Sequence, residues 1–165
     1  MPQHSRDEVE REFQRFVERG SANDWSAWAD QFTEDALYVE HAMGTFRGRE
    51  AIRDWITVTM ASVSGMTFPV EWHVIDGNRV IMYCWNVFEP LAGMTGDYRF
   101  AVITILEYAG DGQWASEEDI YNEKEAEAVL VRFLEDAAAA GHAPPTGPET
   151  RTRSPPDKAG TAPGR

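Results

Sequence analysis

Two strong turn signals separate long apolar segments in the second half of the chain, and they restrict the possible folds more than any other feature. Residues 76–78 read Asp-Gly-Asn and residues 109–112 read Ala-Gly-Asp-Gly. Turns of this composition join antiparallel neighbours in β-hairpins. Residues 90–97 form a looser connection between the two hairpins. The pattern therefore predicts four consecutive antiparallel strands, at 67–75, 79–89, 98–108 and 113–121.

Helical periodicity dominates the first third of the chain and returns after the last strand. Ser5 and Glu8 form a capping box before a first helix that runs to about residue 19. Asp24 caps a second, shorter helix, and Gly48 opens a third. A strand at 36–41 that continues toward residue 46 lies between these two helices, and a last helix spans about 122–140.

This order of elements predicts the α+β class, with a curved antiparallel sheet wrapped around the N-terminal helices. Helices that close one end of such a sheet leave a cone-shaped barrel with a central pocket. The chain of 165 residues has the length of one domain, which we assign to residues 1–141. Residues 142–165 are dense in Pro and Gly and poor in apolar residues, so they are expected to be a disordered tail.

The charge and the single cysteine exclude several classes of partner. A net charge of −13 disfavours nucleic acid and anionic membranes. The sequence has no apolar run long enough to cross a bilayer and no apolar signal segment, so a cytoplasmic location is expected. Cys84 alone provides neither a disulfide nor a thiolate cluster, and we expect no metal and no cofactor.

Strand alternation brings a set of acids and phenols to the expected pocket. Tyr38 and Glu40 share one face of their strand, and Glu117, Asp119 and Tyr121 share one face of the last strand. If both faces are concave, carboxylates and phenols meet in a largely aromatic cavity. Burial and mutual repulsion would then keep one acid protonated while another is ionised, which is the arrangement for acid/base chemistry.

A simpler interpretation stays open for these residues. The acids at 117–119 also fit the solvated end of a strand, and Glu40 also fits an acceptor for a Trp or Tyr donor. His41 faces away from Glu40 unless a bulge intervenes, but it remains a candidate for substrate binding. Trp28 and Asn86 are candidate lining residues, and Trp28 fits the core equally well.

Four segments of the sequence resemble the nuclear transport factor 2-like superfamily, which includes the SnoaL-like polyketide cyclases and the ketosteroid isomerases. They are NDWSAWADQFTEDALYVEH, FRGREAIRDWI, DGNRV and YAGDGQWASEEDIYN. The resemblance covers about residues 5–140. It implies the cone-shaped fold and a pocket for a small hydrophobic ligand. The superfamily contains isomerases, cyclases, dehydratases, epoxide hydrolases and non-enzymatic binders, so the fold alone does not assign an activity.

The resemblance also suggests roles for individual positions. The general base of the ketosteroid isomerases falls on Glu40. Their two oxyanion donors fall on Phe16 and Thr104, neither of which is the family residue, and the histidine of the cyclases falls on Glu117. In the epoxide hydrolases an Asp-Arg-Asp set activates water, but strand alternation points Arg99 away from the pocket if Thr104 points inward.

These observations predict cofactor-free acid/base catalysis on a small hydrophobic carbonyl or hydroxyl compound, of the isomerase, cyclase or dehydratase type. We expect Glu40 to be the base, Asp119 its protonated partner and Tyr38 a hydrogen-bond donor to the ligand. The alternatives are a non-catalytic binder and an epoxide hydrolase-like enzyme. We also expect a homodimer that packs through the outer face of the sheet, where Trp72 or Trp85 would otherwise leave an exposed apolar patch.

Overall fold

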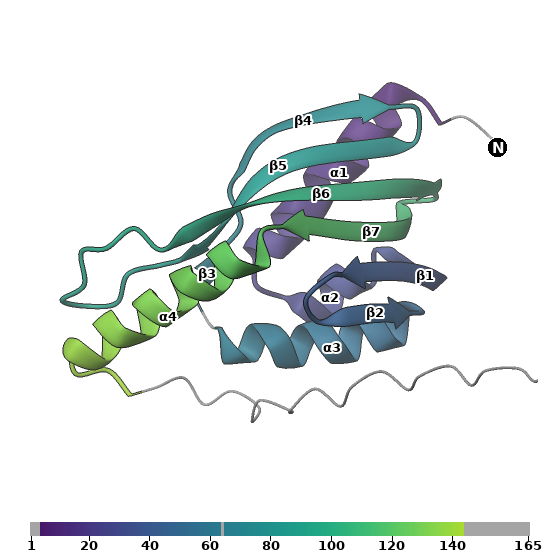
Figure 1. Ribbon diagram of the computed structural model, residues 1–165. Helices are drawn as coiled ribbons and strands as arrows, with labels where there is room; N and C mark the ends of the chain where they lie inside the picture. Colours follow the sequence, from purple (N-terminus) through teal and green to yellow (C-terminus); the bar gives the residue numbers. More distant parts are fainter. Residues whose placement is uncertain (1–3, 64, 144–165) are drawn as a thin grey trace, which may run out of the picture.

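The computed structural model describes residues 4–63 and 65–143. Over these residues the chain alternates between helices and strands in the order that the sequence predicts (Figure 1). The helices are α1 (Arg6–Ser21), α2 (Trp25–Ala29), α3 (Arg49–Ser62) and α4 (Glu123–Ala139). The strands are β1 (Phe32–Glu40), β2 (Gly44–Arg47), β3 (Met66–Thr67), β4 (Val70–Asp76), β5 (Arg79–Phe88), β6 (Arg99–Gly110) and β7 (Gln113–Tyr121).

The strands form one sheet in the order β2-β1-β7-β6-β5-β3, and β4 pairs with β5. The sheet is curved and does not close into a barrel (Figure 1). The helix α1 lies behind β4–β6 in this view, and α2 and α3 lie beside β1 and β2. The predicted α+β class is therefore confirmed, but one pair of strands, β1 and β7, is parallel rather than antiparallel.

The structure changes two of the predicted strands. The strand expected to run from 36 toward 46 is a hairpin, because β1 ends at Glu40 and β2 begins at Gly44, whose φ of 136° suits glycine. The segment 67–75 is divided into β3 and β4 around Pro69, which has no amide hydrogen for a sheet hydrogen bond. Both changes follow from backbone chemistry at single residues.

The concave face of the sheet carries the hydrophobic core. Burial alternates along β6, where Phe100, Val102 and Leu106 are buried and Arg99 is exposed. Val9 and Phe13 on α1 close the core from the other side, because their helical spacing places both on one face of the helix. The buried face of β6 therefore points toward the helices, as strand alternation predicts.

Local hydrogen bonds fix where the helices begin. The Ser5 hydroxyl accepts from the Glu8 amide, and the Asp24 carboxylate accepts from the Ala27 amide, so both predicted caps are confirmed. The Asn122 side chain accepts from the amides of the first turn of α4. Since Asn122 directly follows β7, this cap starts α4 at the end of that strand.

The predicted tail lies mostly outside the described residues, which end at 143. Before that point, a His142 ring nitrogen lies 2.8 Å from the Ala92 carbonyl oxygen. None of the helices in residues 4–63 and 65–143 has the length and apolar character to span a membrane.

Candidate active site

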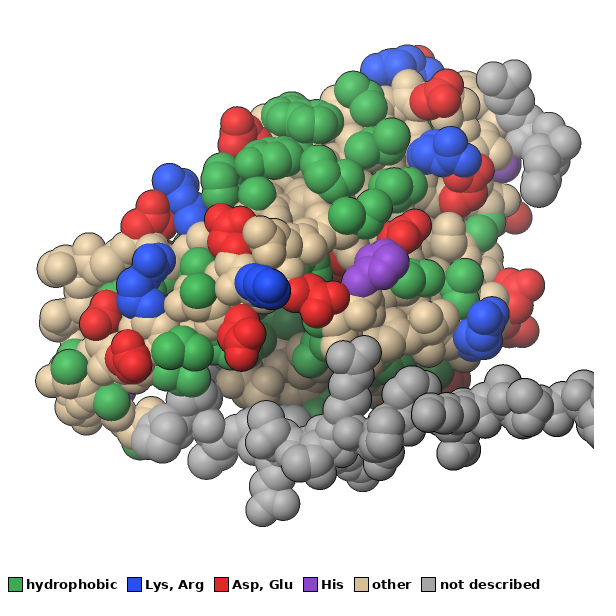
Figure 2. Space-filling model, viewed as in Figure 1, with side chains coloured by type: hydrophobic (Ala, Val, Ile, Leu, Met, Phe, Trp, Pro, Cys, Tyr) green, Lys and Arg blue, Asp and Glu red, His purple; other side chains and the backbone are tan. Residues whose placement is uncertain are grey.

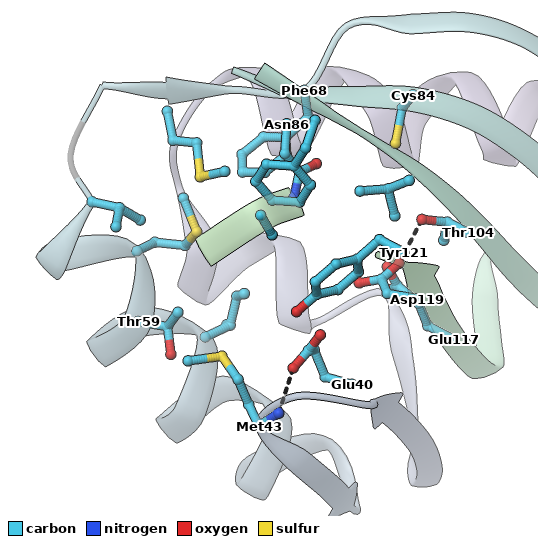
Figure 3. A pocket seen from close by; sticks show the side chains of 18 of the residues that line it. Glu40, Met43, Thr59, Phe68, Cys84, Asn86, Thr104, Glu117, Asp119 and Tyr121 are labelled. Carbon is cyan, nitrogen blue, oxygen red and sulfur yellow. Dashed lines mark hydrogen bonds between the residues drawn. The ribbon is translucent and has the colours of Figure 1, made fainter. Parts of the chain in front are cut away.

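A pocket of about 410 Å³ lies against the concave face of the sheet (Figure 3). Most of its wall is aromatic or aliphatic, contributed by the inner faces of α1–α3, β5 and β6 and by one side of α4. Its volume is in the range of pockets that enclose small molecules. Carboxyl groups gather on the part of the wall formed by β1 and β7.

Strand register brings these carboxyl groups together. In the parallel pair, Tyr38 lies beside Glu117 and Glu40 lies beside Asp119. On the other side of β7, Thr104 lies opposite Asp119. All five side chains face the pocket, so the two predicted shared faces are confirmed and both are concave.

Asp119 is held by two hydroxyl donors. The Tyr38 hydroxyl donates to Oδ2 at 2.5 Å and the Thr104 hydroxyl donates to Oδ1 at 2.5 Å. Burial raises the pKa of Asp119 from 3.8 to about 6, although both hydrogen bonds act in the opposite direction. Asp119 is therefore mainly ionised at neutral pH. Burial, followed by the charge of Asp119, raises the pKa of Tyr38 well above its ordinary value, so this phenol keeps its proton.

Glu117 differs from Asp119 in its hydrogen bonding. Its side chain is buried, and Oε2 has no hydrogen-bond partner. Burial, followed by the charge of Asp119, raises the pKa of Glu117 well above its ordinary value. We expected Asp119 to be the protonated acid of the site. The hydrogen bonds instead favour an ionised Asp119 and a protonated Glu117, because only Asp119 receives two hydroxyl donors.

Glu40 is 5% exposed and points into the same pocket (Figure 3). Its Oε2 accepts the Met43 amide hydrogen at 2.6 Å, whereas its Oε1 has no partner. This amide comes from the turn between β1 and β2, so the turn orients the carboxyl group. The Tyr121 side chain extends toward Glu40 in Figure 3, and burial together with Glu40 raises the pKa of the Tyr121 phenol.

The other predicted residues divide into two groups. Phe16, Trp28, Asn86 and Thr104 all line the pocket, and the Phe16 and Trp28 rings also pack in the core with centroids 5.2 Å apart. The placement of His41 at the pocket is corrected, because its side chain is exposed and pairs with Glu118 at 2.8 Å on the other side of the sheet. No bulge reverses its direction, since the turn begins directly after Glu40.

Sequence reasoning missed much of the apolar wall. The side chains of Met43, Met60, Met82 and Phe68 line the pocket. Met60 belongs to the apolar stripe of α3, so the signal was present, but a stripe does not distinguish a pocket wall from a packed core. Cys84 also lines the pocket, and burial raises the pKa of its thiol to about 12, which keeps it protonated. A thiolate nucleophile is therefore disfavoured here.

Metal ligands do not gather in the described part of the chain: residues 4–63 and 65–143 contain no group of three or more His, Cys, Asp or Glu side chains arranged to hold an ion. The site consists of carboxyl and hydroxyl groups in an apolar enclosure. Such groups bind, orient and exchange protons with an organic ligand.

Fold and pocket together define a small α+β protein with a largely apolar pocket that carries carboxyl groups on one wall. The SnoaL-like domain matches residues 13–117, and the chain belongs to this family of the nuclear transport factor 2-like superfamily. The family predicted from the sequence motifs is therefore confirmed. Comparison with curated proteins gave no match.

Several solved structures share the fold at low sequence identity. An LEH-like epoxide hydrolase from M. tuberculosis has a TM-score of 0.65 and 18% identity, covering 82% of this chain and 97% of that one. A proposed SnoaL-like polyketide cyclase from Shewanella denitrificans has a TM-score of 0.64 and 14% identity, covering 77% and 99%. A protein of ketosteroid isomerase-like fold from Catenulispora acidiphila, in complex with trimethylamine, has a TM-score of 0.59 and 20% identity, covering 83% and 97%. At these identities the likeness concerns the fold.

Proposed function

We propose that the protein catalyses proton transfer, without a cofactor, on a small hydrophobic carbonyl or hydroxyl compound, as an isomerase, cyclase or dehydratase does. One observation carries the proposal: three neighbouring carboxyl groups in one apolar pocket have different hydrogen-bond partners. Glu40 keeps one buried oxygen free, Glu117 keeps one buried oxygen free, and Asp119 has both oxygens engaged. Pairs of acids with different environments are the usual sign of separate acid and base roles.

The proposed base is Glu40. Its Oε2 is fixed by the Met43 amide, which leaves Oε1 to accept a proton from a carbon next to the ligand carbonyl. Protonated Glu117 donates its proton to the carbonyl oxygen, so that an enol forms without a net change of charge in the ligand. Return of the proton from Glu40 to a different carbon completes an isomerisation and restores both acids once the enol hydrogen returns to Glu117.

Asp119 and its donors act on this pair rather than on the ligand. Burial raises the pKa of Glu117 most, and the charge of the ionised Asp119 raises it further. The hydroxyls of Tyr38 and Thr104 hold Asp119 in place. Because the Tyr38 hydrogen is committed to Asp119, the proposed direct donation from Tyr38 to a ligand requires that this bond first be broken. The hydroxyl of Tyr121, on the same face, is better placed to contact a ligand beside Glu40 (Figure 3).

Two alternatives are less well supported. An Asp-Arg-Asp epoxide hydrolase needs an arginine at the pocket, whereas Arg99 pairs with Asp97 at 3.1 Å and is not among the lining residues. A non-catalytic binder fits the internal hydrogen bonding of Asp119, which needs no ligand to satisfy it. The binder also fits an apolar wall that would hold a hydrophobic molecule without transforming it.

Exchange of carbon-bound hydrogen for deuterium separates catalysis from binding without knowledge of the natural substrate. We would incubate the protein in D₂O with a panel of hydrophobic ketones and follow the signal of the hydrogens beside the carbonyl by NMR. Glu40→Gln should slow the exchange by about 10²–10⁴-fold, the usual effect of losing a positioned base. Glu118→Gln is the matched control, because Glu118 neighbours the site acids on β7 but pairs outward with His41.

The outcome discriminates clearly. Wild-type exchange rates in a folded Glu40→Gln protein would refute Glu40 as the base. Ketones that bind but show no accelerated exchange with the wild-type protein would favour the non-catalytic binder.

The proposed homodimer uses the outer face of the sheet. Figure 2 shows hydrophobic side chains gathered on the upper part of this face, over β4–β6. Trp72 and Val74 on β4 are 46% and 50% exposed, and the Trp72 ring stacks on Tyr83 with centroids 5.5 Å apart. Large exposed apolar patches usually mark protein contacts, so a second copy of the chain is the proposed partner. A cytoplasmic location stays a prediction from the sequence.

A further inference from the structure

The charge of the pocket is unbalanced. Its lining includes five carboxyl side chains, whereas no Lys, Arg or His lines it among the described residues. Three of the five acids lie deep against β1 and β7, as described above. The other two, Glu123 and Glu127, are exposed on α4, where the pocket meets the solvent.

Two of the three deep acids each have a carboxyl oxygen without a hydrogen-bond partner. Oε1 of Glu40 is buried and unbonded in a side chain that is 5% exposed, and Glu117, at 4% exposed, has a second such oxygen in Oε2. A buried carboxylate that is neither paired nor fully hydrogen-bonded is costly to the folded state. A proton on Glu117 relieves one of the two. Burial raises the pKa of the Tyr121 phenol and its interaction with Glu40 raises it further, but the Tyr121 hydroxyl makes no hydrogen bond of normal geometry to Oε1 of Glu40. A ligand in the pocket can supply the donor that Oε1 lacks.

The wall around this oxygen suits a cation with an apolar body. Aromatic rings of Trp28, Trp55 and Tyr38 line the same pocket as Glu40, and the Tyr38 centroid lies 4.9 Å from that of Trp55 and 6.4 Å from that of Trp28. The faces of such rings attract ammonium groups electrostatically. Methionine side chains complete the wall, and they adapt to irregular apolar shapes. An anionic head group would instead meet several carboxylates and no positive charge.

We propose that the pocket selects a hydrophobic compound that carries a protonated amine, with the ammonium group donating to Oε1 of Glu40 and the apolar part lying against the aromatic wall. Glu123 and Glu127 attract the cation from solvent at the mouth, although salt weakens this long-range effect. Oε1 of Glu40 cannot hold the ammonium group and take a carbon-bound proton at the same time, because Oε2 is bound by the Met43 amide. The proposal therefore goes beyond the proposed function and rests on the pocket rather than on the role of Glu40 as a base.

Three probes with one indole ring and different head groups test the choice of charge. Tryptamine carries an ammonium group, tryptophol a neutral hydroxyl group and indole-acetate a carboxylate. Isothermal titration at neutral pH and moderate salt should give tryptamine an affinity at least about 10-fold above that of tryptophol, because charge-assisted hydrogen bonds to a buried carboxylate are strong. Indole-acetate should show no measurable binding.

Two variants test whether the preference for tryptamine over tryptophol depends on Glu40. Glu40→Gln should remove most of the advantage of tryptamine and leave the affinity for tryptophol within about 2-fold, since the amide keeps the shape and loses the charge. Glu118→Gln, on the opposite face of β7, should leave all three affinities unchanged. If Glu40→Gln does not fold, the comparison of the three probes on the wild-type protein remains a sufficient test.

Equal or weaker binding of tryptamine relative to tryptophol, including no binding of tryptamine, would overturn the proposal. The result is independent of catalysis. If the wild-type protein binds tryptamine no better than tryptophol but still accelerates hydrogen exchange in ketones, the amine class of ligand is refuted and the acid/base function stands. A Glu40-dependent preference for the amine without any exchange would support the charge-selective pocket and refute the catalytic role.

Discussion

Replacing Asp119 by Asn should change how the stability of the protein depends on pH. Burial raises the pKa of Asp119 in the folded protein from 3.8 to about 6. A raised carboxyl pKa means that the folded state binds this proton more tightly than the unfolded state. The stabilisation from the bound proton is therefore fully present below about pH 4 and is lost as the pH rises through about 6.

The magnitude follows from the size of the shift. One pKa unit corresponds to about 1.4 kcal/mol, so ionising Asp119 lowers the free energy of unfolding by about 3 kcal/mol in total, and about 2 kcal/mol of this falls between pH 4.5 and pH 8. The side-chain amide of the variant does not titrate. The variant should therefore gain about 2 kcal/mol relative to the wild type over this interval. Removing the charge of Asp119 also removes a repulsion that raises the pKa of Glu117. Ionisation of Glu117 therefore costs the variant less stability than it costs the wild type, which adds to the gain of the variant.

Urea denaturation followed by the fluorescence of the six tryptophans measures this difference at several pH values. The variant changes hydrogen bonds to Tyr38 and Thr104 as well, but that change adds a nearly constant offset. The slope of the difference against pH therefore carries the information. Glu118→Gln is the control and should change by less than about 1 kcal/mol across the interval, because exposed ion pairs contribute little. Parallel stability curves for wild type and Asp119→Asn would refute the burial argument.

Three further predictions concern the site, the backbone and the outer face. Tyr38→Phe removes a hydrogen-bond donor to the ionised Asp119, so the pKa of Asp119, measured by NMR, should rise above about 6. The melting temperature should therefore fall more at pH 8 than at pH 5. An unchanged pKa of Asp119 would contradict this prediction. Gly48→Ala adds a Cβ 3.1 Å from a backbone carbonyl oxygen at a φ of 88°, and it should cost about 1–3 kcal/mol in urea denaturation. Gly65→Ala, at a φ of 91° without close neighbours, should cost less, and equal costs would show that the contact is irrelevant. Trp72→Ser should shift the protein toward monomer in light scattering; a wild-type monomer at micromolar concentration would contradict the dimer itself.

Local signals in the sequence were sufficient for most of the fold. The turn at residues 76–78 and the caps at Ser5 and Asp24 depend on residues a few positions apart, and the structure has all of them. Strand alternation also placed Tyr38 and Glu40 on one face and sent Arg99 to the other side of its sheet. These features follow from the two-residue repeat of a strand and from short-range hydrogen bonding, which a sequence records directly.

Residues far apart in the chain decided the rest. The hydrogen bond from Tyr38 to Asp119 joins positions 81 residues apart. It depends on the parallel pairing of β1 with β7, which no short-range pattern in the sequence predicts. The proton was expected on Asp119, but burial and the partners of each oxygen place it more favourably on Glu117.

The sequence by itself thus determined which acids of β1 and β7 share a face of their strand, because alternation along a strand is a local property. Only the tertiary structure decided which acid is hydrogen-bonded, which is left unpartnered and which keeps its proton. A pKa is set by burial and by neighbouring groups from other strands, and these are fixed only when the register between distant segments is fixed.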